Sequence, residues 1–300
     1  MEFLRAHAAK IAIGIVTLFV VLIVGEQLIV NRSNRMDTSV SDNRSTDASS
    51  PNAALSEPAT TPIAQEVIST YVVEVLRTIP HDTQAFTQGL AFDNGDLYES
   101  TGQYGSSSLR KLDPQTGKVL KKVAVDAAYF AEGMVVVGGK AYQLTWQSGI
   151  GFIYDIKTFQ QLRTFSYFGE GWGLTYDGEN MIMSDGTSSL RFLDPDSLLI
   201  RRMLPVTANG ILVKNLNELE VVKGEIWANV WQTDTIARIN PKTGKVIGWI
   251  DCAGLLTPEE RSGADVLNGI AYDAKRDIVL ITGKNWSKMF EVRVKLKEKM

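Results

Sequence analysis

The sequence contains very little cysteine or histidine. Its 300 residues include one cysteine, Cys252, and two histidines, His7 and His81. One cysteine cannot form an internal disulfide, and so few thiol and imidazole groups argue against a zinc site. A Ser-His-Asp triad would have to use His81, but this residue lies in a turn-like stretch, and we interpret it as a solvated loop histidine. We therefore expect no metal and no other cofactor.

The sequence also lacks an excess of basic residues. It has 31 Lys and Arg residues against 34 Asp and Glu residues, which gives a formal net charge of −3 and a pI near 5.6. A nucleic-acid-binding domain would carry a basic surface, so we expect no nucleic-acid partner. Hydrophobic residues make up 44% of the chain and charged residues 22%, as in an ordinary globular protein.

The longest apolar run lies at the N-terminus. Arg5 and Lys10 precede apolar residues 11–25, and three more apolar residues follow at 28–30. Together these segments match the roughly 20 residues of a membrane span, and no small-x-small cleavage site follows them. We therefore predict that residues 1–30 form an uncleaved membrane signal anchor, with a cleaved signal peptide as the alternative. The basic flank predicts that the rest of the chain lies on the periplasmic or extracellular side, or is exported if the segment is cleaved.

Residues 31–69 differ in composition from the sequence on either side. Ser, Thr, Asn, Asp, Ala and Pro dominate this stretch, and it contains no aromatic residue. It buries too little apolar surface to offset the entropy lost on ordering, so we predict a flexible low-complexity tether. Beyond it, short β-type runs alternate with turn pairs such as Asn94-Gly95 and Asp177-Gly178. We predict a single all-β domain over residues 70–300.

One strand pattern recurs five times in this domain. The copies begin at Gln88, Glu132, Trp172, Asn217 and Asn268, which lie 40 to 51 residues apart. Further strands follow each copy, and units of four antiparallel strands at this period predict a five-bladed β-propeller. The fifth unit lacks a fourth strand because the chain ends. We predict that an extra apolar strand at residues 71–79 supplies it and closes the ring.

In a propeller, the starts of the first strands and the ends of the second strands meet at one mouth of the central channel. The repeat register brings polar and aromatic residues together there. Besides the five first-strand starts, the set includes Trp146, Trp231 and Lys284 at second-strand ends, and Phe86 and Phe130 two residues before their strands. A concave pocket with apolar walls and a few polar groups is typical of a small-ligand site. Asp185 also lies near this mouth, but we interpret it as a turn residue.

Glu132 is the one acidic residue among the five first-strand starts. A pair of catalytic carboxylates is hard to assemble from this set, and the sequence contains no nucleophile elbow and no phosphate loop. A single carboxyl group among aromatic side chains loses hydration, which raises its pKa toward neutrality and suits it to proton transfer. Two functions fit this pattern. The protein is either an enzyme that uses Glu132, or a non-catalytic surface-tethered propeller that binds a peptide or glycan at its aromatic mouth.

An ordered set of short motifs resembles the plant-type glutaminyl-peptide cyclotransferases, also called glutamine cyclotransferases. The motifs are Phe86-x-Gln88-Gly89, Phe130-x-Glu132-Gly133, Trp146, Gly171-Trp172-Gly173, Asn217-Glu218-Leu219-Glu220, Asn229-x-Trp231 and Gly283-Lys284. The resemblance covers about residues 71–295. It implies a five-bladed propeller that converts the N-terminal glutamine of peptides or proteins to pyroglutamate, releases ammonia and requires no metal.

The resemblance also implies roles for individual residues. Glu132 would be the general acid/base. The substrate-binding residues would comprise an aromatic wall of Phe86, Phe130, Trp146, Trp172 and Trp231, and the polar residues Gln88, Asn217 and Lys284. The polar residues would hydrogen-bond the substrate, and some of them would stabilise the developing oxyanion. Asn268 matches by repeat register only, and we expect it at the rim.

Overall fold

The computed structural model describes residues 67–298. The predicted signal anchor, residues 1–30, and most of the predicted tether lie outside the described residues. Within residues 67–298, no helix is both long enough and apolar enough to cross a membrane. Strands account for nearly all regular structure in this range, where the single α-helix, α2 (Pro258–Arg261), has only four residues. The predicted all-β class is therefore confirmed.

Three of the sheets are antiparallel and four-stranded, and each is continuous in sequence. The first contains β2 (Thr87–Asp93), β3 (Asp96–Thr101), β4 (Ser108–Leu112) and β5 (Val119–Ala124). The second contains β6 (Ala131–Val137), β7 (Lys140–Thr145), β8 (Ile150–Asp155) and β9 (Gln161–Ser166). The third contains β10 (Leu174–Tyr176), β11 (Met181–Met183), β12 (Ser189–Leu193) and β13 (Ile200–Pro205). A hairpin of β14 (Thr207–Ala208) and β15 (Ile211–Leu212) follows.

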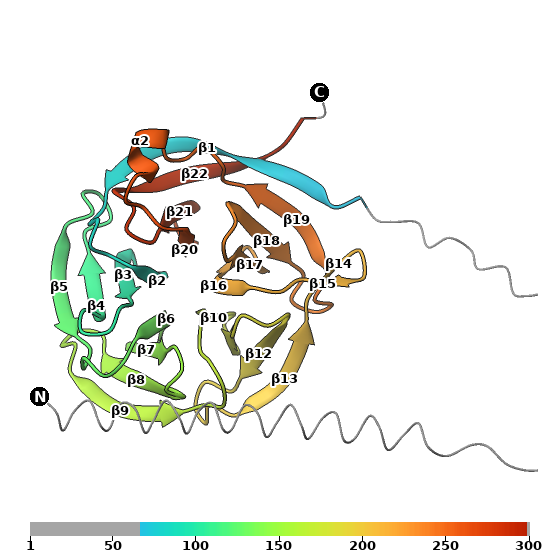
Figure 1. Cartoon of the computed structure of the whole chain (residues 1–300). Helices are drawn as coiled ribbons and strands as arrows, with labels where there is room; N and C mark the ends of the chain where they lie inside the picture. The colour runs from blue at the N-terminus through green and yellow to red at the C-terminus, as the bar shows by residue number, and fades with distance from the viewer. Residues whose placement is uncertain (1–66, 299–300) are drawn as a thin grey trace, which may run out of the picture. The chain divides into compact units, whose positions relative to one another are not determined.

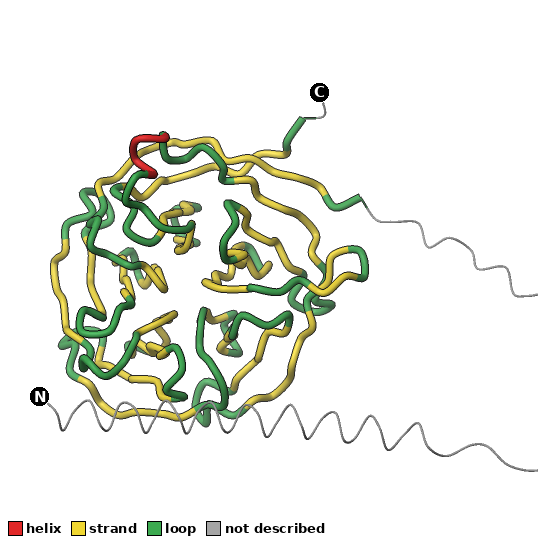
Figure 2. Tube along the Cα trace, viewed as in Figure 1, coloured by secondary structure: helices red, strands yellow, loops and turns green. Residues whose placement is uncertain are grey.

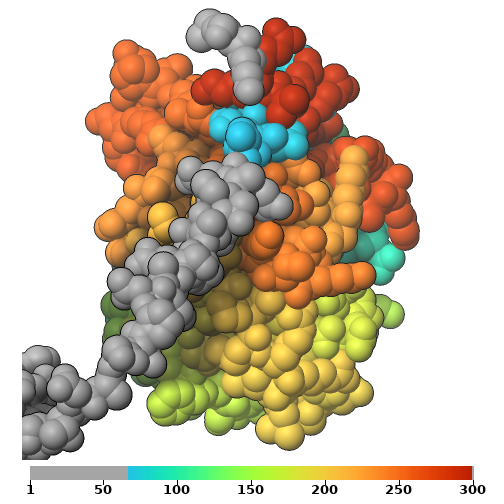
Figure 3. Space-filling view, turned by 90° about the vertical axis from the view of Figure 1, so that its right-hand side faces the viewer, coloured from blue at the N-terminus to red at the C-terminus, as the bar shows by residue number. Residues whose placement is uncertain are grey.

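The remaining strands form one sheet of eight, in the order β16-β17-β18-β19-β1-β22-β21-β20. Their bounds are β1 (Ser69–Pro80), β16 (Leu216–Val222), β17 (Glu225–Val230), β18 (Thr235–Ile239), β19 (Val246–Asp251), β20 (Leu267–Asp273), β21 (Ile278–Gly283) and β22 (Lys288–Leu296). β1 pairs antiparallel with β22 along most of its length, as predicted for residues 71–79. Its start also pairs parallel with β19, which the sequence did not predict. In Figure 3 the blue start of β1 lies between red C-terminal atoms and orange atoms.

The sheets surround a central axis, and the first strands β2, β6, β10, β16 and β20 lie innermost (Figure 1). Figure 2 shows how completely strands make up this ring, with α2 at its periphery. Glycines let the inner strands approach one another. A Cβ atom on Gly89 would lie 2.5 Å from the backbone nitrogen of Met134, and one on Gly133 would lie 2.5 Å from the carbonyl oxygen of Trp172. A side chain at either position would push neighbouring strands apart.

The turns between third and fourth strands repeat one geometry. In the first sheet, Oδ1 of Asp113 accepts hydrogen bonds from the backbone nitrogens of Gln115 and Thr116, at 2.8 and 3.0 Å. The same arrangement recurs at Asp155, Asp194 and Asn240. Short Asp and Asn side chains stabilise such turns by bonding the backbone two and three residues ahead. The recurring turn explains why the sequence repeat is visible.

The hydrophobic core lies between neighbouring sheets. Phe192 of β12 and Ile226 of β17 are at most 1% exposed and belong to one cluster. Leu109 of β4 and Phe152 of β8 belong to another cluster, which joins the first two sheets. Burying a side chain of this size stabilises a fold by about 1.5–3 kcal/mol. Packing between sheets therefore holds the inner strands, and the residues at their starts, in place.

Candidate active site

Bulges mark the starts of four of the five inner strands. The ladder to the second strand shifts register at Gln88 in β2, at Glu132 in β6, at Asn217 in β16 and at Asn268 in β20. A bulge takes a residue out of the ladder and redirects its side chain. In the third sheet, β10 begins at Leu174, so Trp172 lies two residues before the strand that it was predicted to start.

Three of these residues form a hydrogen-bonded chain. Nε2 of Gln88 donates to Oε1 of Glu132 at 3.0 Å. Nδ2 of Asn268 donates to Oε1 of Gln88 at 3.2 Å and to the carbonyl oxygen of Thr87 at 3.0 Å. Glu132 is 5% exposed, Gln88 3% and Asn268 0%, so all three side chains are buried. Asn268 fixes the Gln88 amide, which in turn fixes one carboxyl oxygen of Glu132.

Burial raises the pKa of Glu132 well above its ordinary value. The positive charge of Lys284 opposes this shift in part, and the negative charge of Glu170 adds to it. Within residues 67–298, no Lys, Arg or His nitrogen lies within ion-pair distance of the Glu132 carboxyl group. A carboxyl group that is desolvated and has no ion-pair partner holds its proton to a higher pH than an exposed one does. This shift suits Glu132 to both donate and accept a proton.

Lys284 follows the end of β21 and is 5% exposed. Burial lowers its pKa, although Glu132 and Asp265 act in the opposite direction. Its Nζ atom lies 4.8 Å from the ring centre of Phe86, which is a cation–π contact. In the part of the chain that the structure describes, this ammonium group has no carboxylate within ion-pair distance and no side-chain hydrogen bond. It is thus a buried cation held by an aromatic ring, with donors available to a ligand.

The predicted aromatic residues form two groups. Phe130 lies at the centre of the first, edge-on to Phe86 at 5.9 Å and to Trp146 at 5.8 Å between ring centres. Trp172 and Trp231 form the second, also edge-on, at 5.5 Å. All five are neither fully buried nor fully exposed. They line the mouth as a partly accessible apolar wall, which is the arrangement that a small organic ligand requires.

Glu170 and Tyr104 belong to this mouth and were not predicted. Oε2 of Glu170 accepts hydrogen bonds from Nε1 of Trp146 at 2.8 Å and from Nε1 of Trp172 at 2.9 Å, which joins the two aromatic groups. Tyr104 lies edge-on to Phe130 at 5.4 Å and is 55% exposed. The repeat register could have found Glu170, because it precedes Trp172 by two residues, just as Phe130 precedes Glu132.

Asn217 lies at the start of β16 but is not bonded to the Gln88–Glu132 chain. It is 3% exposed, and its Oδ1 atom is buried without a hydrogen-bond partner. Its backbone carbonyl accepts a hydrogen bond from Oγ of Ser184 at 2.6 Å, which fixes the strand. A buried acceptor without a partner costs free energy, so its presence favours a ligand-binding role.

The interpretation of His81 as a solvated loop residue is wrong. Its side chain is 1% exposed, and Nε2 lies 2.8 Å from Oε1 of Glu99 while Nδ1 lies 2.9 Å from the carbonyl oxygen of Trp286. The segment after β1 folds inward, so a turn-like sequence became a buried contact. Asp185 accepts hydrogen bonds from Thr187 and pairs with Arg191, which agrees with the structural role expected for it.

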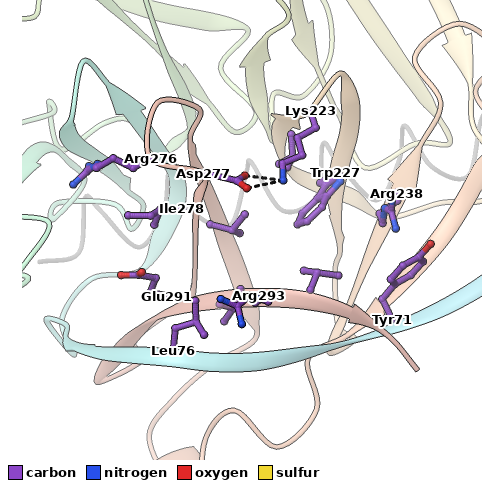
Figure 4. Close-up of a pocket in the computed structure, with 14 residues that line it drawn as sticks. Tyr71, Leu76, Lys223, Trp227, Arg238, Arg276, Asp277, Ile278, Glu291 and Arg293 are labelled. Atoms are coloured by element: carbon purple, nitrogen blue, oxygen red, sulfur yellow. Dashed lines mark hydrogen bonds and ion pairs between the residues drawn. The ribbon is translucent and has the colours of Figure 1, made fainter. Parts of the chain in front are cut away.

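A hollow lies beside the turns that join β16 to β17 and β20 to β21 (Figure 4). It has a volume of about 630 Å³ and lies between β17 and β21, with Tyr71 and Trp227 in its lining. Its charged residues are already paired: Lys223 with Asp277 at 2.7 Å, and Arg238 with Glu225 at 2.8 Å. It therefore offers a ligand volume but little unpaired polar chemistry. A buried carboxyl group and a buried ammonium group without ion-pair partners, Glu132 and Lys284, lie at the other end of the inner strands.

No group of three or more His, Cys, Asp or Glu side chains within residues 67–298 is placed to hold a metal ion. The chemistry open to these residues is proton transfer by Glu132, hydrogen bonding by the amides and charge stabilisation by Lys284. An all-β ring with a buried carboxyl group beside an aromatic wall is the framework of a small-substrate acid/base site.

Comparison with known proteins agrees with this class of site. The glutamine cyclotransferase family model matches residues 49–294. A glutaminyl-peptide cyclotransferase from Arabidopsis thaliana is 44% identical over 229 residues, which cover 74% of this chain and 71% of that protein. The crystal structure of glutaminyl cyclase from Myxococcus xanthus is 37% identical and has a TM-score of 0.70, covering 77% of this chain and 99% of that one. The chain therefore belongs to the glutamine cyclotransferase family.

Proposed function

We propose that this protein is a glutaminyl-peptide cyclotransferase. It converts the N-terminal glutamine of peptides or proteins to pyroglutamate and releases ammonia. The observation that carries the proposal is Glu132, a buried carboxyl group with a raised pKa, hydrogen-bonded to Gln88 at 3.0 Å and located at an aromatic mouth. Membership of the family and the names of both relatives support the same reaction.

The reaction needs one group that both takes and gives a proton. The α-amino nitrogen of the substrate attacks the carbon of its own side-chain carboxamide, and a new C–N bond closes the five-membered ring. Glu132 takes the proton that the attacking nitrogen loses and delivers it to the carboxamide nitrogen, which leaves as ammonia. Glu132 thus returns to its starting state. Both reacting groups belong to one residue, so the mouth accelerates the reaction largely by holding them together.

The neighbouring residues position Glu132 and the substrate. Gln88 holds Oε1 of Glu132 and leaves Oε2 free of hydrogen bonds from the described residues. The Lys284 ammonium stabilises the negative charge that develops on the carboxamide oxygen. Asn217 Oδ1, buried without a partner, accepts a hydrogen bond from a substrate N–H group. The five aromatic residues enclose the glutamine side chain and exclude water.

We also propose the finer architecture and the location. Counting β16–β19 as one blade and β20–β22 with β1 as another makes the fold a five-bladed propeller, because the change from antiparallel to parallel pairing falls between β19 and β1. We propose that residues 1–30 anchor the protein in a membrane and that residues 31–69 tether the propeller on the extracytoplasmic side, or that the propeller is exported if the segment is cleaved. Support for the location comes from the sequence pattern alone.

An ammonia-release assay tests the proposed activity. The purified protein is incubated with a glutamine-initiated dipeptide at several pH values between about 6 and 9. Ammonia and the cyclised product should form in equal amounts. The N-acetylated dipeptide is the matched control, because its blocked nitrogen cannot attack. Binding of the dipeptide without ammonia release at any pH would favour the non-catalytic binding module instead.

A further inference from the structure

One carboxylate joins two tryptophans from different sheets. Oε2 of Glu170 accepts both indole hydrogen bonds, from Trp146 at 2.8 Å and from Trp172 at 2.9 Å, and Oε1 accepts from Nε2 of Gln147 at 3.0 Å. Trp146 follows β7 in the second sheet, and Trp172 precedes β10 in the third. Because the two indoles share one acceptor atom, Glu170 fixes their orientation relative to each other.

This carboxylate is charged, and no cation compensates it. Burial alone would raise the pKa of Glu170, but the hydrogen bonds from Gln147, Trp172 and Trp146 outweigh burial and lower it. Among residues 67–298, no Lys, Arg or His side chain lies within ion-pair distance of Glu170. The mouth therefore contains two acidic groups: Glu170, which stays negatively charged, and Glu132, which gains and loses a proton.

Other tryptophans show that an indole does not require such a charge. Nε1 of Trp286 donates to the neutral backbone carbonyl of Asp265 at 2.9 Å. Nε1 of Trp227 donates to Glu225 at 3.2 Å, but that carboxylate is neutralised by Arg238 at 2.8 Å. An unpaired carboxylate that accepts two indoles is thus particular to the mouth, which argues for a role beyond packing.

We propose that Glu170 is a positioning residue for cyclisation: it orients the indoles of Trp146 and Trp172 as the substrate wall and keeps a negative charge beside the general acid/base. This inference rests on the proposed cyclotransferase function. Glu170 acts through its neighbours and need not touch the reacting atoms. Its charge also attracts the protonated α-amino group of an approaching peptide, so its loss weakens binding as well as turnover.

The charge has a consequence that packing alone would not produce. Glu170 raises the pKa of Glu132, so removing its charge lowers that pKa. The limb of the pH–rate profile that belongs to Glu132 then moves to lower pH, whether the limb reports its acid or its base form. A change that only loosened the tryptophans would reduce the rate without moving this limb.

The test compares Glu170→Gln with two controls in the full-length protein. Glu170→Gln keeps the shape of the side chain but loses the charge. Gln147→Ala removes the third hydrogen-bond donor and leaves the charge. Glu179→Gln removes the charge of a glutamate whose side chain is 82% exposed, in the turn after β10. Ammonia release from a glutamine-initiated dipeptide is measured against pH and substrate concentration, and melting temperatures confirm that each variant is folded.

We expect Glu170→Gln to lower kcat/KM at least tenfold and to move the Glu132 limb to lower pH. Glu179→Gln should retain the wild-type profile, and Gln147→Ala, which leaves the charge of Glu170 in place, should leave the limb unmoved. A Glu170→Gln profile within twofold of wild type, or a lower rate with an unmoved limb, would overturn the proposal. If the wild type itself releases no ammonia, the proposed function has failed. The positioning of the two indoles by Glu170 is then judged from their NMR signals. In ¹⁵N NMR of the six tryptophan indoles, Glu170→Gln should shift the signals of Trp146 and Trp172, and that of Trp231 through its ring contact with Trp172, and leave the three tryptophans outside the mouth in place. Unchanged signals overturn this positioning whatever the activity.

Discussion

Glu132 of β6 and Glu99 of β3 are both buried glutamates, yet their surroundings are opposite. Glu132 is 5% exposed, accepts one side-chain hydrogen bond from a neutral amide and has a raised pKa. Glu99 is fully buried, lies 2.8 Å from Nε2 of His81 and 3.6 Å from Nη1 of Arg110, and accepts a hydrogen bond from Thr87. Burial alone would raise the pKa of Glu99 as well, but its cationic neighbours hold it below the ordinary value.

The difference separates a group that changes protonation from one that stays charged. Without a counter-ion, the buried Glu132 carboxyl group has a pKa well above its ordinary value and holds its proton to higher pH than an exposed glutamate does. The charge of Glu99 is fixed, and Glu99 raises the pKa of His81 despite the opposing effect of burial. The two regions meet at Thr87, which bonds Glu99 through its side chain and Asn268 through its carbonyl oxygen. The Glu99 region therefore supports the chain of hydrogen bonds that ends on Glu132.

The largest expected effect is on activity, in Glu132→Gln. The variant keeps an acceptor for Gln88 but cannot transfer a proton, so kcat should fall by about 10²- to 10⁴-fold, the usual contribution of a general acid/base. Its melting temperature should not fall, because no ion pair is lost. Ammonia release and thermal unfolding measured on the same preparation check both statements. Turnover close to that of the wild type would remove Glu132 from the mechanism.

The matching change in the other region, Glu99→Gln, should act on stability. It leaves His81 and Arg110 buried without their anionic partner, and breaking a buried ion pair typically costs about 3–5 kcal/mol. Urea unfolding measures this loss as a lower midpoint. The double variant His81→Gln/Glu99→Gln is the control, and its loss should be smaller than the sum of the two single losses. A single variant as stable as the wild type would mean that the pair contributes nothing.

Much of the hydrogen-bonded chain around Glu132 could be predicted from the sequence. The repeat register placed Gln88, Glu132 and Asn268 at equivalent strand starts, and two of the three hydrogen bonds that link them and Thr87 run between these positions. The repeat register identifies these equivalent positions because the Asp or Asn turn and the apolar inner strand recur from one unit to the next. Glu170 occupies the same register position as Phe86 and Phe130, but these aromatic residues give no reason to expect a carboxylate there.

The rest depended on contacts that local patterns do not encode. The pairing of His81 with Glu99 depends on how the segment after β1 enters the ring, and its second contact is with Trp286, 205 residues away. The parallel pairing of β1 with β19 is likewise a consequence of closure. No sequence pattern predicted the bulges at the starts of the inner strands. These bulges determine where the Glu132 and Gln88 side chains lie.

Lys284→Met sharpens the comparison because it removes the positive charge that lowers the pKa of Glu132. Loss of an oxyanion donor typically costs about 10²- to 10³-fold in kcat. Lys284 lowers the pKa of Glu132, so its removal should move the Glu132 limb of the pH–rate profile to higher pH, opposite to Glu170→Gln. Lys223→Met, at an exposed ion pair in the turn between β16 and β17, is the control. A limb that moves to lower pH in Lys284→Met would contradict the assignment of that limb to Glu132.

The smallest effect is the pH dependence of stability, and it has opposite signs in the two regions. Glu132 has a folded pKa above 4.5. Its contribution to the free energy of unfolding is therefore complete below pH 4.5 and is lost as the pH rises, so Glu132→Gln should gain stability relative to wild type with rising pH.

Glu99 has a folded pKa below 4.5. Its contribution to the free energy of unfolding is therefore complete above pH 4.5 and is lost as the pH falls. The deficit of Glu99→Gln should therefore shrink in acid. Its full size is expected between pH 4.5 and 6.5, because His81, with a pKa raised above 6.5, loses its charge at higher pH. Each unit of pKa shift corresponds to about 1.4 kcal/mol, so urea unfolding at several pH values between about 4 and 8 resolves both trends. Two differences that change in the same direction would show that the two carboxyl groups do not differ in the way their surroundings indicate.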